Sequence, residues 1–348
     1  MKIKNKFLAI ILVLTISLAG GCGNDNYLKD ENGKLIVNET TGQSVQKDIL
    51  CQPEKDSELY KIYEENESQL SVKVSELPTC EEFTPTSNAY SGLWQALLVK
   101  PLAFLLLKVG YLFNNFGISV ILLGLLIRLI MLPLSLKSMR QSKVMQQMQP
   151  EIARIEKKYA GRTDNEAMMA KSQETMMVYQ KYKINPVSGC LIALIQIPLF
   201  FAFLSAINKV PAIFEGELFG MNLGMTPWKG LSEGQYIYII LIFLIVFTTY
   251  ISFKNSMKTT QNDEMMKQMN MMFMFMIVSI SIASFSLPTA IAFYWIVTNG
   301  FAVFQNYLIK KILDKDDTSK KSKKVIDVKH KEKNRKKWEY ANSDRVKK

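Results

Sequence analysis

Residues 116–136 read FGISVILLGLLIRLIMLPLSL and contain a single charged side chain, that of Arg128. A helix needs about 20 predominantly apolar residues to cross the hydrocarbon core of a bilayer. This stretch therefore predicts a transmembrane helix, although the mean hydropathy of the 348-residue chain is only +0.05. The average is low because strongly polar segments separate the apolar blocks.

Further apolar blocks predict four more transmembrane spans, at about 187–207, 235–253, 270–287 and 289–309. Pro288 divides the last block into two helices, because proline cannot continue a helix. We therefore expect an all-α polytopic membrane protein with a core of five transmembrane helices over residues 116–310.

The polar segment 137–185 shows two helical patterns between the first and second spans. Gly161 can supply the turn between them, and Thr163-x-x-Glu166 has the spacing of a capping box at the start of the second helix. The segment therefore predicts a helical hairpin.

Residues 1–22 place lysines before an apolar run, and small residues before Cys22. This is the layout of a signal peptide and resembles that of a bacterial lipoprotein, in which Cys22 would receive lipid, such as palmitate, and become the mature N-terminus. The alternative is an uncleaved anchor with an incidental cysteine.

Residues 23–90 are acidic and polar, so we expect an extracytoplasmic segment with little core of its own. Cys51 and Cys80 in this segment form either a disulfide or two reduced thiols.

Residues 91–115 are apolar but interrupted by Lys100-Pro101 and Lys108, with Trp94 and Tyr111 near the two ends. This pattern favours an amphipathic helix that lies at the outer membrane interface. The alternative is an additional true span, which would invert the orientation of everything downstream.

Lysine and arginine residues indicate the orientation of the chain. The hairpin contains ten of them, the tail 311–348 is richer still, and 208–234 contains only Lys209 and Lys229. By the positive-inside rule the hairpin and the tail are cytoplasmic, and the N-terminus is extracytoplasmic. The basic tail has two candidate partners, the ribosome and anionic lipid.

Arg128 is the most informative single residue, because a guanidinium within a span costs about 2.5 to 3.5 kcal/mol on insertion scales. It lies twelve residues after Phe116, roughly 18 Å along a helix. Burial against a carboxylate is one interpretation, but the five predicted spans contain no Asp or Glu. A hydrated cavity is therefore favoured. Neutral polar residues that could line it are Gln196, Thr248, Thr249, Ser279, Ser281, Thr298, Asn299, Gln305 and Asn306.

Methionines gather in the hairpin and at the start of the fourth predicted span. Flexible thioethers suit surfaces that accept many different apolar helices, although core filling explains the hairpin group equally well. The cysteines lack metal-ligand spacing and the only histidine is His330 in the tail, so we expect no metal, no cofactor and no catalytic residues.

Four stretches resemble the YidC/Oxa membrane protein insertases. They are LLIRLIMLPL at 125–134, MQPEIARIEKKY at 148–159, MMVYQKYKINPVSGCLIALIQIPLF at 176–200 and AFYWIVTNGFAVFQ at 292–305. The resemblance covers about 116–310, and it departs from the family pattern at Ile192, where a proline is frequent.

The resemblance implies a groove that opens to the cytoplasm and to lipid. Arg128, Gln196 and Trp295 match family positions in or near this groove. With Tyr294, Thr298 and Asn299 they make up our predicted substrate groove.

The predicted function is the insertion and folding of newly made membrane proteins in a bacterial cytoplasmic membrane, alone or with a Sec translocon. Driving force would come from hydrophobic transfer, since no nucleotide-binding motif is present. The alternatives are a membrane-anchored assembly chaperone and a small-solute transporter. The transporter is disfavoured because no inverted repeat and no second intramembrane charge are visible.

Overall fold

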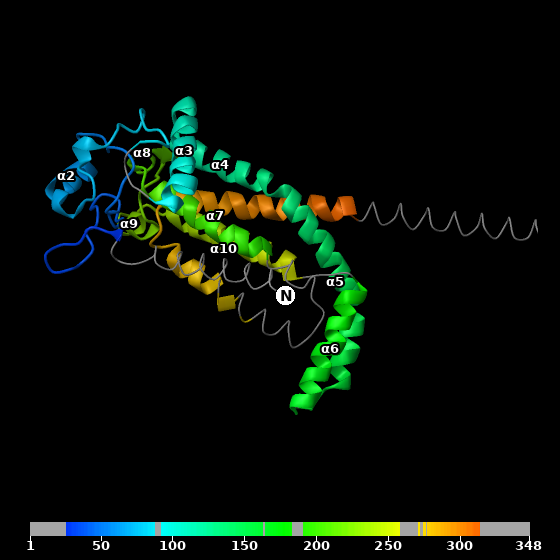
Figure 1. Cartoon of the computed structure of the whole chain (residues 1–348). Coiled ribbons are helices and arrows are strands. Elements are labelled where there is room, and N and C mark those ends of the chain that lie inside the picture. Colours follow the sequence, from blue (N-terminus) through cyan, green and yellow to red (C-terminus); the bar gives the residue numbers. More distant parts are fainter. Residues whose placement is uncertain are drawn as a thin grey trace, which may run out of the picture. The chain divides into compact units, whose positions relative to one another are not determined.

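The computed structural model describes residues 26–87, 92–162, 164–182, 191–257, 271, 274–275 and 277–313. The described chain is predominantly helical, as expected (Figure 1). The signal segment 1–22 with Cys22, and nearly all of the tail 311–348, lie outside these residues. The chain divides into two compact units, Met1–Ala302 and Val303–Lys348. The packing described below lies within the first unit.

The described helices and strands follow one another along the chain as α2 (Glu58–Glu65), a π-helical turn η5 (Gln95–Val99), α3 (Lys100–Phe113), α4 (Phe116–Ile130), α5 (Leu132–Lys158), α6 (Asn165–Lys181), α7 (Leu191–Asn208), α8 (Pro211–Phe214), β1 (Glu217–Leu218), β2 (Met221–Asn222), α9 (Pro227–Ser232) and α10 (Ile237–Met257). Short 3-10 turns lie at Glu67–Gln69 and Val74–Glu76. After α10, residues 277–283 and 289–313 are helical, and we call the second of these runs the last helix.

Residues 26–87 form a folded segment, which we call the acidic module, and the expectation that it has little core is wrong. Leu28, Leu50, Tyr63 and Phe83 are among its fully buried side chains. Isolated bridges rather than long strands hold its backbone together. Its apolar residues follow neither the helical nor the strand period, which is why the sequence showed no core.

A disulfide joins Cys51 to Cys80 within the acidic module. Both cysteines are buried, and the parallel bridge between Gln52 and Thr79 lies directly beside the bond. Of the two states that the sequence left open, the structure has the disulfide.

The loop between α7 and α10, residues 209–236, contacts three other parts of the chain. The acidic module donates from the backbone N–H of Leu50 to the carbonyl of Lys209 (2.8 Å). The side chain of Asn115 donates to the carbonyl of Glu217 (3.1 Å). The backbone N–H of Thr289 donates to Met225 (3.1 Å). This loop also contains the β1–β2 hairpin, whose turn residues Phe219 and Gly220 both have positive φ, as a type I′ turn requires.

The first predicted span, 116–136, is bent by 52° where α4 ends and α5 begins. Pro133 lies in the first turn of α5 and cannot donate a backbone hydrogen bond to Leu129. The straight helix therefore ends at Ile130, six residues before the end of the predicted span.

Helices α5 and α6 lie side by side (Figure 1). Met148, Ile152, Ile155 and Val178 form the small core between them. Gly161 has a φ of +78°, which provides the turn between them. The N-cap of α6 is Asp164, whose side chain accepts from the backbone of Ala167, rather than the predicted Thr163, which lies outside the described residues.

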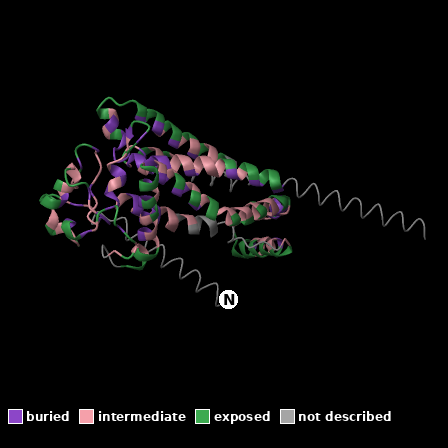
Figure 2. Ribbon diagram, turned by 90° about the horizontal axis from the view of Figure 1, so that it is seen from above, coloured by how far each residue is buried: buried purple, intermediate pink, exposed green. Residues whose placement is uncertain are grey.

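Gln95–Phe113, which combines η5 and α3, is long and apolar enough to cross a membrane, and so is Ile237–Lys254 in α10. Length and composition therefore do not decide between the interfacial helix and the additional span. In Figure 1, α3 runs across the direction shared by α4, α7 and α10. Figure 2 shows exposed residues along the outer faces of the helices, as expected of surfaces that face lipid.

Replacing both Cys51 and Cys80 with serine is expected to destabilise the acidic module by about 3 kcal/mol, because the disulfide joins residues 29 positions apart. The measurement is limited proteolysis of residues 26–87 in the detergent-solubilised full-length protein at increasing urea concentrations. Cys190→Ser, outside the module, is the control. Unchanged protease resistance of the double variant would contradict this account.

Candidate functional site

Arg128 lies in the last turn of α4, two residues before that helix ends. Its side chain is half-buried, and its buried Nε atom has no hydrogen-bond partner among the residues that the structure describes. Among the described residues no carboxylate forms a salt bridge with it, so the interpretation as an arginine paired with a carboxylate gains no support. The titratable side chain that interacts with it electrostatically is Tyr294 of the last helix.

Tyr294 and Thr298 are buried between the last helix and its neighbours. The Tyr294 ring stacks on Phe203 of α7, with centroids 4.2 Å apart. On the other side it faces Gly124 of α4, where an added Cβ would lie 3.1 Å from the ring and 3.3 Å from Thr298. Glycine at this position lets α4 approach the last helix closely.

Trp295 and Asn299 point to a different helix, α10. The indole Nε1 of Trp295 donates to the hydroxyl oxygen of Thr249 (3.0 Å), and the side-chain amide of Asn299 donates to the same oxygen (3.3 Å). Thr249 is 1% exposed. One buried threonine therefore fixes two of the predicted groove residues.

The structure thus divides the predicted groove residues into two groups. Arg128, Tyr294 and Thr298 lie where α4 meets the last helix, whereas Trp295 and Asn299 lie against α10. Gln196 is half-buried in α7, two residues before Pro198. Tyr294 and Thr298 are both buried in this structure.

Sequence reasoning missed the residues that join these two groups. Phe200 of α7 contacts both of them, with its ring centroid 6.2 Å from Tyr294 and 5.3 Å from Trp295. Phe203 and Gly124 likewise carry no polar signal that would distinguish them within an apolar helix. Thr249 was recognised as one of nine neutral polar residues, but only its contacts single it out.

The methionines of α6 are exposed to solvent, whereas Met148 of α5 is buried in the core between the two helices. The exposed set is Met168, Met169, Met176 and Met177. Core filling therefore explains Met148 but not the methionines of α6. Met271 and Met274, near the start of the fourth predicted span, are exposed as well.

The chemistry available at the site is electrostatic attraction and apolar contact. An unpaired guanidinium can attract an anionic group, and flanking aromatic rings can contact an apolar segment. In the described part of the chain, no cluster of histidine, cysteine or carboxylate side chains could hold a metal ion.

Comparisons with known proteins confirm the resemblance inferred from the four sequence stretches. Residues 106–317 match the model of the 60Kd inner membrane protein family. The chain is 34% identical over 233 residues to the membrane protein insertase YidC of Oceanobacillus iheyensis, covering 66% of this chain and 88% of that protein. It is 36% identical over 218 residues to the membrane protein insertase MisCA of Bacillus subtilis, covering 62% and 79%. The chain therefore belongs to the 60Kd inner membrane protein family.

Proposed function

We propose that this protein inserts newly made membrane proteins into the membrane and helps them to fold; its relatives are named membrane protein insertases. The observation that carries the proposal is Arg128, a half-buried guanidinium that forms no salt bridge with a described carboxylate and lies against the last helix. Such a group is expensive within a membrane and is retained where it has a role.

The proposed arrangement has five spans, with the acidic module outside and the α5–α6 hairpin and basic tail in the cytoplasm. The charge distribution supports it, because the hairpin is rich in lysine and arginine. The contacts of the loop 209–236 support it independently. The acidic module, the start of α4 and the start of the last helix all bond to this loop, and the five-span arrangement places all four on one side of the membrane.

The same contacts favour an interfacial α3 over an additional span. The segment before α3 reaches the loop through Leu50 and Lys209, and the residue after it reaches the same loop through Asn115 and Glu217. A helix that crossed the membrane would place these two contacts about 30 Å apart, on opposite faces of the bilayer. We therefore place α3 at the outer interface.

In the proposed mechanism, the apolar segment of a client first meets the exposed methionines of α6. Its short polar flank then moves toward Arg128, which attracts acidic side chains in that flank, through a hydrophilic groove that is open to the cytoplasm and to lipid. The apolar segment finally passes into lipid beside the first, fourth and fifth spans, gaining about 0.8 kcal/mol for each buried CH₂ group.

The partners proposed besides lipid and nascent membrane proteins are a Sec translocon and the ribosome, the latter through the tail 311–348. The proposed location is the bacterial cytoplasmic membrane, with Cys22 as a lipid-carrying N-terminus outside. The mass of the mature N-terminal peptide tests the lipid, and ribosome cosedimentation with and without the tail tests the ribosome.

An assembly chaperone is the second candidate, because the exposed methionines of α6 suit the holding of apolar helices whether or not they are moved. The two functions differ in their need for Arg128. A chaperone would tolerate its loss, whereas insertion of an acidic flank would not.

Arg128→Ala is expected to reduce the insertion of a single-span client with an acidic N-terminal flank by about tenfold, since it removes an interaction between charged groups. Protease protection of the flank in proteoliposomes measures this, and Arg128→Lys should retain most of the activity. A client with a neutral flank should be affected much less. Equal insertion by wild type and Arg128→Ala would favour the chaperone.

Thr249→Val is expected to impair insertion and to lower stability by about 1–3 kcal/mol, because it leaves the donors of Trp295 and Asn299 without their shared acceptor. Thr248→Val is the matched control, since within the described residues that hydroxyl bonds to carbonyls of its own helix alone. The measurements are thermal unfolding and the client protection assay, together with the tryptophan emission spectrum. Identical behaviour of the two variants would show that the shared bond has no role.

The orientation is tested by labelling intact cells with a membrane-impermeant maleimide in a Cys190→Ser background. Glu64→Cys in the acidic module should react, whereas Lys171→Cys in α6 should react only after the membrane is opened, because the proposed hairpin is cytoplasmic. Labelling of Lys171→Cys in intact cells would exclude the proposed orientation.

A further inference from the structure

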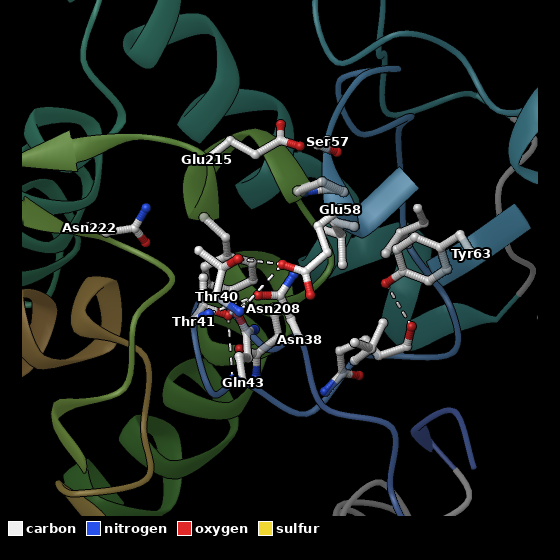
Figure 3. A pocket seen from close by; sticks show the side chains of 16 residues that line it. Asn38, Thr40, Thr41, Gln43, Ser57, Glu58, Tyr63, Asn208, Glu215 and Asn222 are labelled. Carbon is white, nitrogen blue, oxygen red and sulfur yellow. Dashed lines mark hydrogen bonds between the residues drawn. The ribbon is translucent and has the colours of Figure 1, made fainter. Parts of the chain in front are cut away.

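A cavity of about 190 Å³ lies where the acidic module meets the residues that follow α7. About six water molecules occupy this volume in liquid water. The module contributes Asn38, Thr40, Gln43 and Glu58 to its lining, and the other wall includes Asn208 and Glu215 (Figure 3). Arg128 and Tyr294 do not line this cavity, and the proposed mechanism does not use it.

The lining is negatively charged. Among the described residues that line the cavity, the charged side chains are those of Glu58 and Glu215, and both are acidic. The module around them is acidic as well, with thirteen Asp and Glu residues against six lysines between 26 and 87. A concave site of one charge sign concentrates ligands of the opposite sign.

Glu58 is held in place as an ionised acceptor. Its carboxylate accepts from the backbone N–H groups of Glu39 (2.9 Å) and Thr40 (3.3 Å), and from the Thr40 hydroxyl. Burial opposes the charged form, but these hydrogen bonds and the positive charge of Lys229 together outweigh burial and lower the pKa of Glu58. Each carboxylate oxygen can accept more than one hydrogen bond, so Glu58 retains capacity for a ligand.

Glu215, the residue after α8, accepts from the backbone N–H of Glu54 in the acidic module (3.1 Å). Burial raises the pKa of its carboxyl, and this cost of keeping it charged would be offset by a cation in the cavity.

Uncharged polar groups complete the lining. Within the described part of the chain, the side-chain amides of Gln43 and Asn208 make no hydrogen bond. Such amides offer both donors and acceptors, which suits a ligand with a peptide backbone better than a bare metal ion. No described cluster of side chains fits a metal.

We propose that this cavity binds the amino-terminal ammonium group of an extended polar peptide, with Glu58 accepting from the ammonium and Asn208 and Gln43 bonding to the first peptide group. The cavity is large enough for a terminal residue but not for a folded partner. The source of the peptide rests on the proposed function, in which the translocated flank of a client arrives on the side of the acidic module.

The test measures binding directly, so that it does not depend on insertion. A short glycine–serine–threonine peptide with a fluorophore at its carboxyl end is titrated with the full-length protein in detergent, and fluorescence anisotropy is recorded near neutral pH. The free amino terminus should bind at least about tenfold more tightly than the acetylated one, because acetylation removes the charge.

Glu58→Gln and Asn208→Ala should each weaken binding of the free peptide severalfold, whereas Glu64→Gln, an exposed residue of the same helix α2, should not. Formation of the Cys51–Cys80 disulfide, seen on a non-reducing gel, verifies that each variant has folded. Asn208 belongs to α7 rather than to the module, so its variant tests the cavity without disturbing the Glu58–Thr40 bonds.

Equal binding of the free and acetylated peptides, or unchanged binding by both cavity variants, would overturn the proposal. An acetylated peptide with an internal lysine that binds as tightly as the free terminus would also overturn it, in favour of a lysine side chain. Client insertion by the same variants is recorded separately. Lost peptide binding with normal insertion leaves the proposed function intact.

Discussion

Backbone hydrogen bonds to the loop 209–236 are the interactions on which the arrangement of the chain depends. Buried backbone groups must find partners, and those of this loop find them in segments far apart in the sequence. The carbonyl of Lys209 accepts from Leu50, and the backbone N–H of Thr226 donates to Thr41 (2.8 Å). The backbone N–H of Trp228 donates to the carbonyl of Phe285 (3.0 Å). One loop thereby joins the acidic module to the turn that precedes the last helix.

These contacts also restrict where the helices can lie. The acidic module, which precedes α3, and Asn115, which follows it, both bond to the same loop, so the chain returns to this loop on either side of α3. The last helix begins at this loop as well, because Ala290 donates to Leu223 (2.9 Å). From there it runs along α4, where Gly124 permits the close approach of Tyr294, and along α10, where Thr249 receives Trp295. The fixed loop end thus determines which side chains of the last helix meet which neighbour.

Arg128 lies away from the loop 209–236, at the other end of α4. It lies at the end of α4, where the bend before α5 interrupts the helix, and in the described part of the chain its electrostatic neighbour is a tyrosine rather than a carboxylate. A paired guanidinium would be neutralised, and its attraction for a third group would be weak. An arginine beside neutral groups keeps that attraction, which fits a protein whose proposed clients carry acidic flanks.

The predictions from sequence agree with the structure better for the helices than for the site residues. Long apolar blocks and Pro288 anticipated the described helices α7, α10 and the last helix, because each depends on residues near in sequence. The bend at Met131 was missed, since Pro133 ends one helix and begins another within a continuous apolar run. Thr249 could not be distinguished from Thr248, because adjacent residues on a helix face different neighbours and the sequence does not say which face meets Trp295.

The sequence by itself determined the apolar helices, the charge asymmetry and the family, because length, hydropathy and short motifs are local properties of the chain. Only the tertiary structure decided that the acidic module has a core, that Cys51 bonds to Cys80 and that Thr249 joins Trp295 to Asn299. The disulfide joins residues 29 positions apart, and Thr249 lies 46 positions from Trp295 and 50 from Asn299. Such long-range contacts depend on the packing of the whole chain, and no local pattern of residue types encodes them.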